Sequence, residues 1–161
     1  MNKFIMKASN GLIENGVLED IITCNKKTIE YGLKLNESEA KTLMSTRKEA
    51  LVNNGRIEFS GEVIRKIIEV FCDSPYISQY NYVDTIDELI DIFYFYKNET
   101  LDFVGDDEMI EMMKNFFDGS CQGSLELLQN REMYKVERNI KNGIHDYLNI
   151  GEDKDDMLIE D

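Results

Sequence analysis

The chain of 161 residues contains no tryptophan, one histidine (His145) and one proline (Pro75). It has no run of about 18 apolar residues, so no transmembrane helix is predicted. The apolar stretch nearest the N-terminus covers only residues 4–6, whereas the core of a secretory signal needs about 7–15 residues. We therefore expect a cytoplasmic protein.

Cysteine is also scarce, with an odd number of three residues at distant positions, Cys24, Cys72 and Cys121. An odd, widely spaced set argues against a disulfide framework. Neither the close Cys or His pairs of a zinc site nor a Gly-rich phosphate loop occurs. The sequence therefore predicts no metal centre and no cofactor.

Basic residues are outnumbered, with 18 Lys and Arg against 32 Asp and Glu, which gives a formal charge of −14. Nucleic acids and anionic membranes repel such a surface, so neither is an expected partner. A cationic protein stays open as a partner, as does the role of an acidic mimic or inhibitor of a nucleic-acid-binding protein. Residues 146–161 hold seven of the acids and one lysine, a composition that predicts a disordered acidic tail.

Apolar residues recur at helical spacing almost everywhere else, which predicts an all-α fold: one compact domain of five to six helices over residues 17–145. Residues 1–16 contain two glycines and are expected to form a loose arm or short strand, and residues 55–59 are a second candidate for a minor β element. Asn36 and Glu39 have the spacing of a capping box. The expected helices span approximately residues 17–31, 36–54, 60–74, 81–98, 106–118 and 124–142. In the second helix the residues that follow helical spacing are Ala40, Leu43, Met44, Arg47, Ala50 and Leu51.

The stretch Gly119-Ser120-Cys121-Gln122-Gly123 has the outline of a nucleophile elbow with a thiol as the nucleophile. An elbow requires a strand before the turn, but residues 106–118 have helical spacing. The only histidine lies beyond a helix about 30 Å long, so a direct pair with Cys121 would be strained. The glycines are therefore interpreted as closing one helix and opening the next. Because Cys121 precedes a helix N-terminus, which can lower a thiol pKa, a thiol-dependent enzyme or redox-responsive protein remains the alternative.

Two groups of residues suggest a protein-binding surface. Tyr76, Tyr80 and Tyr82 lie in the connection 74–82, and Met112 and Met113 lie on the helix 106–118. Tyrosine and methionine both suit adaptable interfaces, although they serve equally well in a helical core. From them we predict a non-enzymatic module that binds another protein. A homodimer is an alternative means of covering surplus apolar surface.

A basic ridge is formed by Arg131, Lys135, Arg138 and Lys141, which share one stripe of the last expected helix. The ridge could dock an acidic partner or the acidic tail of the same chain. The alternative is an ordinary helix surface in which Glu132 and Glu137 balance the basic side chains.

Four pieces of the sequence together resemble a small uncharacterised bacterial family, a domain of unknown function found mainly in Gram-positive anaerobes. They are GRIEF at 55–59, FCDSPYISQYNY at 71–82, LIDIFYFYKNETLD at 89–102 and DDEMIEMMKNFFDGSCQGSLELL at 106–128. The resemblance covers approximately residues 30–142. It implies a bacterial, cytoplasmic setting, and it carries no activity, cofactor or catalytic residue over to this chain.

Overall fold

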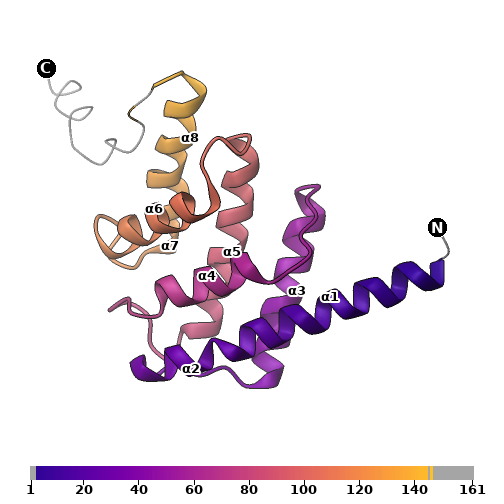
Figure 1. Ribbon diagram of the computed structural model, residues 1–161. Coiled ribbons are helices and arrows are strands. Elements are labelled where there is room, and N and C mark those ends of the chain that lie inside the picture. The colour runs from indigo at the N-terminus through magenta and orange to yellow at the C-terminus, as the bar shows by residue number, and fades with distance from the viewer. Residues whose placement is uncertain (1–2, 145, 147–161) are drawn as a thin grey trace, which may run out of the picture. The chain divides into compact units, whose positions relative to one another are not determined.

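The computed structural model describes residues 3–144 and 146 (Figure 1). These residues form helices, turns and bends and contain no strand, so the predicted all-helical fold is confirmed. Six helical stretches dominate, the last of them made of three consecutive elements. In order they are α1 (Lys3–Thr23), α3 (Glu37–Asn53), α4 (Glu62–Phe71), α5 (Tyr82–Glu99), α6 (Asp106–Asp118), and the run of α7 (Leu125–Leu127), η2 (Leu128–Glu132) and α8 (Met133–Lys141).

The structure corrects the expectation for the N-terminal residues. Residues 3–16, predicted as a loose arm or short strand, belong to α1, and residues 55–59 form no strand. A short helix, α2 (Asn25–Thr28), and a 3-10 turn, η1 (Ile29–Tyr31), then follow α1 and end at Gly32. Of the predicted acidic tail, only Asp146 belongs to the described residues.

The first of two compact units comprises residues 1–94. Within it α1 packs against α3 and α4. The predicted capping box starts α3: the Asn36 side chain accepts a hydrogen bond from the Glu39 amide at 2.7 Å, and Glu39 accepts one from the Asn36 amide at 2.9 Å. The fully buried residues of this unit include Val17, Ile21, Leu43, Ile64, Ile67 and Phe93.

The second unit comprises residues 95–161, so the division falls within α5. In this unit α6 contacts η2, and η2 continues directly into α8. Here η2 is a π-helical segment, a local widening that often marks positions with special side-chain requirements. The buried residues include Met109, Met113, Phe117, Leu128, Met133 and Val136.

Candidate functional site

A pocket in the first unit lies between α1, α3 and the connection that joins α3 to α4. Arg47, on the inner face of α3, holds this connection in place. Its Nη2 donates to the Ser60 carbonyl oxygen at 2.9 Å and to the Glu58 carbonyl oxygen at 3.3 Å. The side chain is only 5% exposed and also pairs with the Glu58 carboxylate at 3.5 Å.

Glu58 is turned inward by a second partner. The Tyr94 hydroxyl, from the buried face of α5, donates to Glu58 Oε1 at 2.6 Å. Just beyond Glu58, the Gly61 amide donates to Asp20 Oδ2 of α1 at 3.1 Å. A side chain at Gly61 would meet that carboxylate oxygen at 2.9 Å, so glycine allows this close approach. The connection is therefore attached to α1, α3 and α5.

The residues on either side of Glu58 are large, apolar and exposed. Ile57 is 79% and Phe59 76% exposed, and Val52 at the end of α3 is 71% exposed. The Glu58 side chain between Ile57 and Phe59 is only 20% exposed, so the segment holds this carboxylate inward while both neighbours face solvent. A partly buried carboxylate between exposed apolar groups reverses the usual pattern, and such reversals are more informative than a single exposed apolar side chain.

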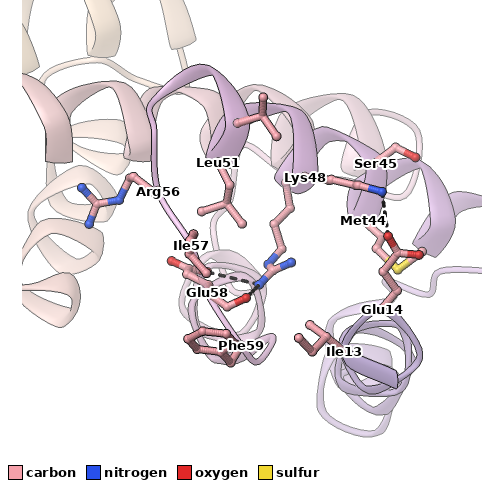
Figure 2. Close-up of a pocket in the computed structure, with 12 residues that line it drawn as sticks. Ile13, Glu14, Met44, Ser45, Lys48, Leu51, Arg56, Ile57, Glu58 and Phe59 are labelled. Carbon is pink, nitrogen blue, oxygen red and sulfur yellow. Dashed lines mark hydrogen bonds and ion pairs between the residues drawn. The ribbon is translucent and has the colours of Figure 1, made fainter. Parts of the chain in front are cut away.

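The pocket between these residues has a volume of about 340 Å³. Figure 2 shows Ile13 from α1 and Phe59 from the connection facing each other across it. Lys48 and Glu14 form an ion pair of 2.8 Å that links α3 to α1 at the same site. The lining residues are Ile13, Glu14, Met44, Ser45, Arg47, Lys48, Leu51, Val52, Arg56, Ile57, Glu58 and Phe59.

The turn around Cys121 has the structure of a helix-to-helix connection. Gly119 ends α6, and a side chain there would meet the Asn115 carbonyl oxygen at 2.8 Å. Gly123 has a φ of 82°, in the region that favours glycine. Ser124, and not Cys121, caps the helix that follows, accepting a hydrogen bond from the Leu127 amide at 3.1 Å.

Backbone donors near Cys121 are used within the turn. The Cys121 amide donates to Phe116 and the Gln122 amide to Gly119, so the amide after the thiol already has an acceptor. In a nucleophile elbow that amide would stabilise an oxyanion. The thiol is buried, and burial raises its pKa, as does the nearby Glu132 carboxylate. These features disfavour an activated nucleophile at Cys121. His145 lies outside the described residues.

The three tyrosines of the connection 74–82 have different environments. Tyr80 is 98% exposed and Tyr76 is partly exposed, but Tyr82 is fully buried at the start of α5. Tyr82 therefore cannot contribute to a surface in this structure. Its burial also raises its pKa, because the phenolate would be poorly solvated.

Met112 and Met113 are buried as well. The proposal that they form part of a contact surface is corrected by their position on the inner face of α6. The same helix carries Met109, Ile110 and Phe117 into the interior. Methionine and phenylalanine at helical spacing fill a core here.

The basic ridge is hydrogen-bonded to the turn that contains Cys121. Arg131 donates from Nη2 to the Ser120 carbonyl oxygen at 3.0 Å and from Nε to Glu132 at 3.2 Å. Glu132 is buried and also accepts from the Ser120 hydroxyl at 2.6 Å, while Lys135 lies 4.0 Å from its carboxylate. Arg131 and Lys135 thus neutralise a buried acid.

The outer part of the ridge is more loosely held. Arg138 lies over the Tyr134 ring at 5.7 Å, and Lys141 pairs with Glu137 at 2.7 Å and with Glu99 at 3.2 Å. The balancing role of Glu132 and Glu137, expected as one alternative, therefore describes much of this surface.

The sequence was compared with models of known protein families, with curated proteins and with solved structures. The sequence model of a family of unknown function, DUF6323, covers residues 20–146, well over half of the chain. The chain belongs to this family. No match was found among curated proteins or among solved structures. The region shared with DUF6323 includes Arg47 and the connection 56–59, whereas Ile13 and Glu14 of α1 lie outside it.

In residues 3–144 and 146, no group of three or more His, Cys, Asp or Glu side chains is placed to hold a metal ion. Among the helices of the same residues, none combines the length and apolar character needed to cross a membrane.

Sequence reasoning missed the pocket itself, although two signals for it are visible. Arg47 falls on the apolar face of its helix, where a charged side chain requires a buried partner. Ile57 and Phe59 flank a single acidic residue in a short segment without helical spacing. Read together, they would have indicated a buried arginine paired with a glutamate next to exposed apolar side chains.

Proposed function

We propose that this DUF6323 protein is a non-enzymatic interaction module that binds a partner protein at the pocket next to Ile57 and Phe59. The observation that carries the proposal is the outward display of these two side chains by an anchored connection. Removing one large apolar side chain from water contributes about 1.5–3 kcal/mol before the costs of association, so two exposed side chains beside a pocket favour a contact there.

The anchoring supports the same proposal through entropy. Ordering a flexible segment on binding costs about 0.5–1.5 kcal/mol for each immobilised side chain. Here Arg47 and Asp20 already hold the backbone of residues 58–61, and Tyr94 holds the Glu58 side chain. A surface that is ordered before binding loses less free energy on association, and central, rigid aromatic residues are typical binding hot spots.

The proposed setting is the reducing cytoplasm. All three cysteines are free and buried, and burial raises the pKa of Cys24 to about 12. Buried, unpaired thiols of this kind are typical of proteins that stay in a reducing compartment.

The test is a pull-down from native cells at low and moderate salt with tagged wild type and three variants. Phe59→Asp should lose a stoichiometric partner that wild type retains. Leu101→Asp, which changes an exposed leucine of the second unit, should keep it. Tyr80→Asp tests the tyrosine connection 74–82 as the alternative binding surface.

If the partner is lost with Tyr80→Asp but retained with Phe59→Asp, the binding surface is the tyrosine connection 74–82 and not the pocket. Equal recovery with all variants would refute a role for both surfaces. Circular dichroism of each variant checks that the helical fold is intact.

A further inference from the structure

Arg47 has hydrogen-bonding capacity that the described residues do not use. All of its hydrogen bonds come from Nη2, and its Nε is buried without a partner. A guanidinium carries five N–H donors, and a buried donor without an acceptor is unfavourable. Arg47 thus lines the pocket and carries a buried Nε–H donor that no described residue accepts.

The charge of the lining supports the same conclusion. Three basic side chains, Arg47, Lys48 and Arg56, and two acidic ones, Glu14 and Glu58, line the pocket, which gives a formal charge of +1. The chain as a whole carries −14. Lys48 is engaged by Glu14, and Glu58 is shared between Arg47 and Tyr94. The lining therefore carries a small positive formal charge on an acidic protein, and exposed apolar side chains lie beside it.

We infer that the occupant is a segment of a partner protein that carries an Asp or Glu side chain adjacent to a large apolar side chain. The carboxylate pairs with the guanidinium of Arg47, and the apolar side chain packs against Ile57 and Phe59. The inference rests on the proposed function, because it names the chemistry recognised at the same surface.

The physical reason lies in the strength and sign of the interaction. Charge-assisted hydrogen bonds between guanidinium and carboxylate are roughly twice as strong as neutral ones. A neutral amide would accept weaker hydrogen bonds from the guanidinium of Arg47. A Lys or Arg side chain of a partner would be repelled by the positive charge of Arg47. The exposed apolar side chains supply affinity, while the carboxylate supplies specificity and fixes the register of the segment.

The first experiment is a selection from a random peptide library displayed on phage, with the full-length chain as bait. Peptides that also bind Phe59→Asp are removed. We expect the remaining peptides to be enriched in Asp or Glu next to Leu, Ile or Phe. Peptides that depend on Phe59 but show no acidic enrichment would overturn the carboxylate inference and leave the docking proposal intact. A selection that yields no Phe59-dependent peptide would count against the docking proposal itself.

The second experiment compares one selected peptide, capped at both ends, with its Glu→Gln or Asp→Asn counterpart. Removing the charge should weaken binding by about 10-fold or more, since a charged hydrogen bond contributes about 1.5–3 kcal/mol. In wild-type protein the ¹⁵N-correlated resonance of the Arg47 Nε–H should shift with the acidic peptide and stay in place with the amide version. Equal affinities and an unmoved resonance would overturn the inference without any need for an Arg47 variant.

Two further results would assign a different occupant. A dimer of the free chain that Phe59→Asp dissociates, measured by analytical ultracentrifugation, would make a second copy the occupant. A small carboxylic acid retained at this site in native mass spectrometry would replace the peptide segment. Either result would overturn the assignment to a separate partner protein.

Discussion

Arg47 and Ser60 are joined by a hydrogen bond of 2.9 Å from the guanidinium Nη2 to the backbone carbonyl oxygen. The bond connects the buried face of α3 to the far end of the connection that leads to α4. The same nitrogen also donates to the Glu58 carbonyl oxygen, so one side chain holds the backbone on both sides of Phe59. The exposure of Ile57 and Phe59 is thus a consequence of the fold.

Replacing Arg47 by methionine should lower the free energy of unfolding by about 2–3 kcal/mol, because it removes the charged hydrogen bonds to Glu58 and Ser60. Lys48→Met removes the same charge one residue along, but from an exposed ion pair with Glu14, and should cost less than about 0.5 kcal/mol. Urea denaturation measures both. Equal effects of the two variants would show that Arg47 does not anchor the connection.

Helical spacing predicted five of the six long helices because apolar faces that recur at a period of 3.6 residues need burial. It failed for the first half of α1, where Gly11 and Gly16 lower the intrinsic helix propensity by about 1 kcal/mol each. The same helix buries Val17 and Ile21 completely. The second half of α1 packs against α3 and α4, and the helix continues through the two glycines of its first half although they disfavour it.

Gly16→Ala should therefore stabilise the protein by about 0.5–1 kcal/mol, because alanine restricts the unfolded chain and favours the helix. Nothing lies within 4 Å of the added methyl group, so no clash opposes the gain. Gly119→Ala is the matched control, and it should destabilise because its methyl group would meet the Asn115 carbonyl oxygen at 2.8 Å. Thermal denaturation compares the two, and an unchanged midpoint for Gly16→Ala would favour a loose arm over a helix.

The candidate surfaces were harder to predict than the helices, for a physical reason. Periodicity identifies which side chains share a face, but it does not say which face a neighbouring element covers. Methionine and tyrosine side chains suit both an interface and a core, and the structure places Met113 and Tyr82 in the core. Arg47 was recognisable as a charged residue at helical spacing with apolar ones, but its acceptors, which lie 11 and 13 residues away, are set by tertiary structure.

Two arginines of the basic ridge should respond differently to the same substitution. Arg131→Gln removes the hydrogen bonds to Ser120 and Glu132 and leaves the buried carboxylate with the Ser120 hydroxyl and the more distant Lys135, which should cost about 1–2 kcal/mol. Arg138→Gln removes a contact with the Tyr134 ring at the surface and should cost no more than about 0.5 kcal/mol. Urea denaturation of both variants gives the comparison. A larger effect of Arg138→Gln would contradict the structural role assigned to Arg131.

Cys121 should react slowly with iodoacetamide in the folded protein. Burial and the Glu132 carboxylate raise its pKa, so less thiolate is present at neutral pH than in a model thiol with a pKa of about 8.5. The inflection of the alkylation rate with pH should therefore lie above that value. Mass spectrometry of peptides from protein alkylated at several pH values resolves Cys121 from the two other cysteines.

A matched reference comes from the same chain. Ser45→Cys places a thiol at an exposed position on α3, where it should react at a rate close to that of a model thiol. Unfolding in urea should bring Cys121 to the same rate, which separates burial from any intrinsic property of the Gly119–Gly123 sequence. If folded Cys121 instead reacts faster than this reference at pH 7, the turn activates its thiol, and a thiol-dependent function takes precedence over the interaction module.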